Sequence, residues 1–119
     1  MGDLSENFSR EEFRCNCEEC DQDAVDHELI NLLEDIRANF GASIKITSGN
    51  RCPEYNKAVG GKQNSQHLKS KAADIIVDGV SPHLVAIWAS ETNPSRYGVG
   101  MYDTFTHVDV RSNMARWGF

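Results

Sequence analysis

Three residues far apart in the sequence have the side chains of a metal site. Asp74 follows His67 by seven residues, and His107 follows Asp74 by 33. Two imidazoles and one carboxylate suit a zinc ion, and three protein ligands leave the fourth tetrahedral position open for water, as in catalytic zinc sites. The residues alone also allow a simpler interpretation, in which His67 is a solvated loop histidine and Asp74 is an acid at a strand edge.

The residues around Asp74 indicate how it could meet His67. Residues 72–77 form an apolar run of Ala, Ile and Val, interrupted only by Asp74, that predicts a well-buried strand. His67 lies in the polar loop that leads into this strand. The loop and the strand could therefore present both side chains to one site.

A second strand, predicted over residues 106–111, carries the other histidine. In an extended chain His107 and Asp109 share one face, and Val108 and Val110 share the opposite face. We expect the valines to enter the core while the polar pair faces a cleft.

The remaining pattern predicts an α+β domain. An apolar stripe indicates a long helix capped by Asp23 and stopped by Gly41. The other expected elements are a short helical turn after Ser9, a strand over 43–47, a short helix from Pro53 to 60–61, a helix from Pro82 to 92 with Leu84, Val85, Ile87 and Trp88 on its apolar face, and a strand over 98–102. Together they predict one domain over residues 1–119, in which a small antiparallel sheet packs against helices, carries the zinc cleft and is covered by residues 1–22.

Composition excludes several classes of function. The chain has 119 residues, 39% hydrophobic and 25% charged, which is ordinary for one globular domain. Its net charge of -6, with no run of Lys or Arg, argues against nucleic-acid binding. No apolar run approaches the ~20 residues of a membrane-spanning helix. We expect a monomer made in the cytoplasm without a signal peptide.

Four cysteines form a second group of candidate ligands. Three of them lie within six residues, and the sequence allows a structural zinc, one or two disulfides, or reduced thiols. The four are Cys15, Cys17, Cys20 and Cys52.

Several separated motifs resemble one enzyme family. They are Ser48-Gly49-x-Arg51, Ser65-x-His67 with Asp74, Gly98-x-Gly100-x-Tyr102, and His107-Val108-Asp109-Val110-Arg111. In this order they resemble the zinc D-Ala-D-Ala carboxypeptidases and related murein peptidases, which share a fold with the zinc domain of hedgehog proteins. The resemblance runs from Phe8 to Trp117, nearly the whole chain.

The resemblance implies a role for each matching residue. His67, Asp74 and His107 would bind one catalytic zinc. Arg51 would face the substrate, where its guanidinium can hold a carboxylate or a developing oxyanion. Ser65 would orient the substrate by hydrogen bonding.

The general base is where the sequence departs from this family. Its members usually place an acid or a histidine a few residues before the last zinc ligand, but Phe105 stands two residues before His107. Asp103 is the nearest upstream acid, and it shares the face of His107 if the strand extends that far. Asp109 is the alternative base, or else the acceptor that orients a ligating imidazole.

The resemblance implies a zinc-dependent peptidase that acts on peptidoglycan peptides. It would be a D-Ala-D-Ala carboxypeptidase or an endolysin-type endopeptidase. Because the sequence shows no signal peptide, we expect it to reach the cell wall after phage-type release or in a virion. A zinc-containing binding module without catalysis is the alternative, because the base is uncertain.

Overall fold

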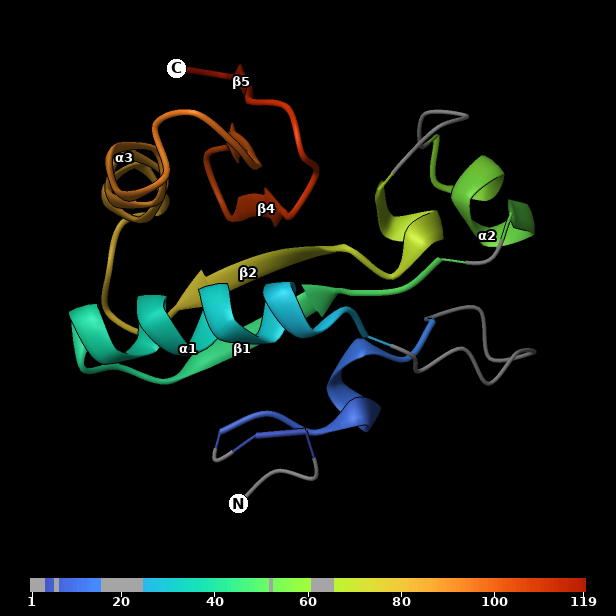
Figure 1. Cartoon of the computed structure of the whole chain (residues 1–119). Coiled ribbons are helices and arrows are strands. Elements are labelled where there is room, and N and C mark those ends of the chain that lie inside the picture. The colour runs from blue at the N-terminus through green and yellow to red at the C-terminus, as the bar shows by residue number, and fades with distance from the viewer. Residues whose placement is uncertain (1–3, 6, 16–24, 52, 61–65) are drawn as a thin grey trace.

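The computed structural model describes residues 4–5, 7–15, 25–51, 53–60 and 66–119 (Figure 1). Along the chain its elements are η1 (Arg10–Phe13), α1 (His27–Phe40), β1 (Ile44–Ser48), α2 (Pro53–Ala58), η2 (Gln66–Lys69), β2 (Ala72–Val77), α3 (Pro82–Thr92), β3 (Gly98–Met101), β4 (Thr106–Asp109) and β5 (Ala115–Trp117). The fold is α+β, as the sequence predicts. None of the described helices is long and apolar enough to cross a bilayer.

The sheet has five strands in the order β1-β2-β4-β3-β5. The pairings β1–β2, β2–β4 and β3–β4 are antiparallel, as expected, but β3 and β5 pair in parallel. The sheet is therefore mixed rather than wholly antiparallel. The sequence pattern does not predict β5, which is only three residues long.

The core lies between the sheet and the helices α1 and α3. In β2 the residues Ala73, Ile75 and Val77 are buried in this core, whereas Ile76 on the other face is 38% exposed. Figure 1 shows α1 along β1 and β2, and η2 and α2 together at the far end of the sheet from α3. The loops at that end are thus placed beside the start of β2.

Two helices differ from the predictions in detail. Asp26, and not Asp23, caps α1, because the Asp26 carboxylate accepts the backbone N–H of Glu28 at 2.8 Å. Gly41 ends α1 with a positive φ of 60°, as predicted. The apolar face predicted for α3 is confirmed at Val85, which is buried, and at Trp88, which packs partly buried against the core. It is wrong at Leu84 and Ile87, which are 57% and 42% exposed, and Ala86 and Ala89 are buried instead. Small alanine side chains let the helix approach the sheet closely.

The described part of the N-terminal segment, residues 4–5 and 7–15, packs on the domain through two phenylalanines, and residues 16–22 of the predicted covering segment lie outside the described residues. Phe8 and Phe13 are both 1% exposed and belong to the core. The carboxylate of Glu12 accepts the backbone N–H of Ser9 at 2.7 Å, which confirms the predicted capping box of this short turn. The Phe13 carbonyl accepts the backbone N–H of Asn50 at 2.8 Å, so the segment also holds the loop after β1.

Candidate metal centre

Two of the three candidate ligands lie opposite each other in the sheet. Asp74 on β2 pairs directly with His107 on β4, and each is less than 10% exposed. Paired residues of antiparallel strands point to the same face of the sheet. The neighbouring pair Ala73 and Val108 is completely buried in the core, so the ligand pair lies on the face away from it. This is the alternation predicted from the sequence.

The third candidate ligand, His67, reaches the pair from η2 and is 3% exposed. Its Nδ1 lies 2.6 Å from the carbonyl oxygen of Gly49. A carbonyl only accepts, so Nδ1 carries the proton and Nε2 keeps its lone pair. Nε2 lies 3.3 Å from Oδ1 of Asp74. The Gly49 hydrogen bond thus selects the tautomer that can bind a metal and directs it at the site.

The three side chains fit a tetrahedral metal ion. Their donor atoms lie within 4.8 Å of one another. Oδ1 of Asp74 is 3.3 Å from Nε2 of His67 and 2.9 Å from Nδ1 of His107. A tetrahedral zinc with ligands at ~2.1 Å separates them by about 3.4 Å, so only small shifts are needed to hold one.

Asp109 orients His107 from behind. Oδ2 of Asp109 accepts Nε2–H of His107 at 2.8 Å, which leaves Nδ1 for the metal site. The same carboxylate also accepts the backbone N–H of Gly98 and of Arg111, together with two N–H groups of the Arg111 guanidinium. Asp109 is completely buried, and a Cβ on Gly98 would collide with its oxygens. This is the geometry of a fixed acceptor.

The electrostatics of the cluster favour positive charge. Burial raises the pKa of Asp74, but hydrogen bonds and charge interactions with His107 and His67 outweigh it and hold the pKa well below its usual value. Burial likewise raises the pKa of Asp109, and His107 and Arg111 outweigh it. Burial lowers the pKa of His107, but hydrogen bonds to Asp109 and Asp74 raise it further than burial lowers it. Two buried carboxylates thus stabilise a cation beside His107, whether a proton or a metal ion.

Arg51, which the resemblance implies faces the substrate, lies at the edge of the same cluster. Its guanidinium contacts Oδ2 of Asp74 at 3.5 Å and Oδ1 of Asn56 at 3.3 Å, and its Nε lies 3.4 Å from Oγ of Ser48. The side chain is 15% exposed. These contacts are long for charge-assisted hydrogen bonds, so the guanidinium can turn toward an anionic group at little cost.

The other predicted site residues are an exposed aspartate, a buried cysteine and four residues that lie outside the described residues. Asp103 is exposed in the turn between β3 and β4. β4 begins at Thr106, so the strand does not extend back to Asp103 as the base prediction required for a shared face. Cys15 is 4% exposed. Ser65 and three of the cysteines (Cys17, Cys20 and Cys52) lie outside the described residues.

Two residues at this site were not assigned a role from the sequence. Arg111 binds Asp109 with two guanidinium N–H groups, and its guanidinium carbon also lies 5.4 Å from the ring centre of Trp117. The Trp117 ring is 5.0 Å from the ring of His107. Arg111 belongs to the quoted motif His107–Arg111, which could have indicated it, but Trp117 is brought here by β5, for which the sequence carries no strand signal.

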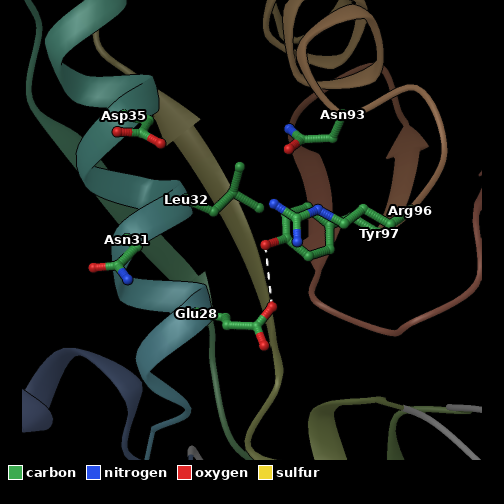
Figure 2. Close-up of a pocket in the computed structure, with 7 residues that line it drawn as sticks. All are labelled: Glu28, Asn31, Leu32, Asp35, Asn93, Arg96 and Tyr97. Carbon is green, nitrogen blue, oxygen red and sulfur yellow. Dashed lines mark hydrogen bonds between the residues drawn. The ribbon is translucent and has the colours of Figure 1, made fainter.

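A pocket elsewhere on the molecule has a different character. Figure 2 shows it between α1 and the loop after α3, where Glu28 and Asp35 face Asn93, Arg96 and Tyr97. The Tyr97 hydroxyl donates to Glu28 at 3.1 Å, and the Arg96 guanidinium lies over the Tyr97 ring. None of the three candidate ligands lines this pocket.

Comparison with known proteins agrees with the site. Residues 6–109 match the family model of peptidase M15. The chain is also similar to a protein from Haemophilus influenzae named probable peptidoglycan L,D-endopeptidase MepK, with 32% identity over 96 residues. That alignment covers 72% of this chain, which spans about half (50%) of the relative's length.

Proposed function

This chain belongs to the peptidase M15 family, and we propose that it is a zinc-dependent peptidase that hydrolyses peptide bonds of bacterial peptidoglycan. One observation carries the proposal: a carboxylate and two imidazoles from β2, β4 and η2 converge with the spacing of a three-ligand metal site. The peptidoglycan substrate is inferred from the name of the relative.

In this proposal His67, Asp74 and His107 hold the zinc. When bound, zinc polarises the scissile carbonyl and makes a water molecule more acidic. Asp109 keeps the proton on Nε2 of His107, and Gly49 keeps the proton on Nδ1 of His67. Both imidazoles then offer the correct nitrogen without rearrangement, which favours metal binding.

Arg51 binds the substrate in this scheme. Its guanidinium lies beside Asp74 and is partly exposed, where a carbonyl oxygen or a carboxylate could accept from it. A cation placed there stabilises the negative charge that develops as the carbonyl is attacked. We expect Ser65 to assist by hydrogen bonding to the peptide.

Asp103 is our proposed general base, and Asp109 is the alternative. The buried carboxylate of Asp109 already accepts five hydrogen bonds, so protonating it would break several of them. Asp103 is exposed to solvent in the turn that leads to His107. It could take a proton from water and return it to the leaving amine.

We propose an endopeptidase rather than a carboxypeptidase. This choice rests on the name of the relative, an endopeptidase. The chain spans about half of that protein, so the proposal concerns the activity of this chain and not the other functions of the relative. Digestion of crosslinked and uncrosslinked muropeptides distinguishes the two activities by their products: an endopeptidase divides crosslinked dimers, whereas a carboxypeptidase releases single terminal residues.

The first experiment measures zinc content and muropeptide hydrolysis on the same preparation. We expect one zinc bound at the histidine–aspartate site, and loss of both zinc and hydrolysis in His67→Ala. His83→Ala is the matched control, because His83 is exposed on α3 and should leave both unchanged. A protein that cannot be loaded with zinc, or a His67→Ala variant that retains full activity, would contradict the proposal.

The second experiment tests the base. Asp103→Asn should bind zinc as the unchanged protein does and lose hydrolysis by about 10²–10⁴-fold. Full activity in this variant would exclude Asp103 as the base. Bound zinc without hydrolysis of any wall peptide, even in the unchanged protein, would instead indicate a binding module.

A further inference from the structure

The candidate ligands belong to a single row of paired residues that crosses the whole sheet. Ser48 pairs with Asp74, Asp74 with His107, His107 with Gly100, and Gly100 with Trp117. The first pairing depends on a one-residue register shift between β1 and β2. Such a bulge moves the next residue to a new partner, and here it brings Ser48 opposite Asp74.

The glycine in this row makes room for the tryptophan. A Cβ at position 100 would collide with the Trp117 ring, so only glycine permits the observed packing. With no side chain between them, the ring covers Gly100 and reaches His107, with 5.0 Å between ring centres. Trp117 is partly exposed, so its ring forms surface directly next to a metal ligand.

Two more aromatic rings extend this surface. The indole N–H of Trp117 donates to the Tyr102 hydroxyl at 2.8 Å. Tyr102 in turn stacks on Phe105, with 4.4 Å between ring centres and 13° between planes. Tyr102 is 40% exposed. We call Trp117, Tyr102 and Phe105 the aromatic wall.

The opposite end of the row is polar and carries a positive charge. Arg51 contacts both Ser48 and Asp74 there. Strands lie ~4.8 Å apart, so the four steps from Ser48 to Trp117 cover about 19 Å, the length of an extended peptide of about six residues. The metal ligands lie between a cation on one side and flat apolar surface on the other. A substrate that crosses the row therefore meets different chemistry on the two sides of its scissile bond.

We propose that the aromatic wall is the specificity surface for the apolar side of the substrate, and that it packs on a small apolar side chain, the size of an alanine methyl group, beside the scissile bond. This inference rests on the proposed function. Flat rings gain stability from the apolar area they cover, and small methyl groups let a peptide lie flat against them. The polar side of the same peptide lies toward Arg51.

The test combines two variants of the wall with two substrates. Trp117→Leu and Tyr102→Ala are assayed for KM, kcat and bound zinc on a synthetic wall peptide that the unchanged protein cleaves, and on the same peptide with glycine replacing the alanine beside the cleaved bond. Leu84→Ala, at an exposed position on α3, is the control. Because Tyr102 is exposed, Tyr102→Ala tests the inference even if Trp117→Leu does not fold.

The expected results separate binding from structure. For the unchanged protein the glycine peptide should have a KM about fourfold higher, the effect of one lost methyl contact. Each wall variant should raise KM for the alanine peptide by about 3–10-fold, remove the difference between peptides, and keep kcat and zinc within about twofold. Unchanged KM values in the wall variants would overturn the inference. A loss of bound zinc large enough to explain all the lost activity would also overturn it, because Trp117 would then act only by supporting His107. If the unchanged protein cleaves no wall peptide, the proposed function itself is wrong.

Discussion

Replacing Asp109 with Asn tests whether this buried carboxylate supports the metal site. The change keeps the shape of the side chain but replaces one oxygen by an NH₂ group. In one orientation that NH₂ faces N–H groups of His107 and Arg111, and in the other it faces the N–H groups of Gly98 and Arg111. Donors meet donors in either orientation, so no rotation of the amide repairs the site.

The size of the effect follows from these contacts. Each buried donor left without an acceptor costs about 1–3 kcal/mol. The Arg111 side chain is 31% exposed and can turn toward water, which reduces the loss. We expect the free energy of unfolding of the metal-free protein to fall by ~2–4 kcal/mol, within the range for breaking a buried charged network. Zinc affinity should fall by about 10–100-fold, as for other residues that orient a metal-ligating histidine.

Two measurements check this prediction. Urea unfolding of the zinc-free protein gives the stability, and zinc titration against a competing chelator gives the affinity. Asp78→Asn is the matched control, since Asp78 is exposed in the turn after β2. An Asp109→Asn protein with unchanged stability and unchanged zinc affinity would refute the assigned role.

Three further perturbations have definite expected outcomes. Gly98→Ala should lower the free energy of unfolding by about 1–3 kcal/mol and weaken zinc binding, because its Cβ would displace the Asp109 carboxylate; a variant with normal zinc affinity would contradict this. Burial raises the pKa of Glu34, but hydrogen bonds led by Asn7 outweigh it and lower the pKa, so Glu34 stabilises the fold above pH ~4.5 and loses this effect as the pH falls through its folded-state pKa. The stability difference between the unchanged protein and Glu34→Gln in urea should therefore be largest near neutral pH and shrink in acid; a constant difference would be inconsistent. Removing zinc with a chelator should speed hydrogen exchange at the Arg51 amide, which donates to η2, more than at amides that join β2 and β4; equal protection in both states would argue against zinc holding η2.

Much of the fold could be predicted because the pattern of apolar and polar residues along the sequence matches the buried and exposed positions in the structure. The apolar run at 72–77 coincides with β2, and the alternation after Thr106 places Val108 in the core and His107 on the opposite face. Such patterns arise because a strand with one buried face must alternate. The two candidate metal ligands in the sheet were therefore predictable once their strands were known.

The features that were missed depend on contacts between distant segments. β5 has only three residues, and the Arg116 guanidinium holds it by donating to the carbonyl oxygens of Tyr97 and Asn93. No local pattern marks such a strand, so the position of Trp117 could not be predicted. Ala86 and Ala89 on the buried face of α3 were missed for a related reason: close packing on the sheet selects small side chains over larger apolar ones there.

The candidate metal site combines a rigid part with a part that the loops must position. Asp74 and His107 are directly paired, so backbone hydrogen bonds fix their separation whether or not a metal is bound. His67 lies on η2, outside the sheet. Its place depends on the Nδ1 contact to Gly49 and on its carbonyl, which accepts the Arg51 amide.

The support of His67 extends to the N-terminal segment of the chain. A Cβ on Gly49 would lie 2.6 Å from Cα of Phe13, so the two backbones are in close contact. The Phe13 carbonyl also accepts the Asn50 amide at 2.8 Å. The Phe13 ring is buried in the core and so fixes the position of its own backbone. That backbone contacts the loop at Gly49 and Asn50, and the Gly49 carbonyl in turn binds His67. The described residues around Phe13 therefore support the candidate metal site, and we expect a change that loosens Phe13 to affect the position of His67 before it affects Asp74 and His107.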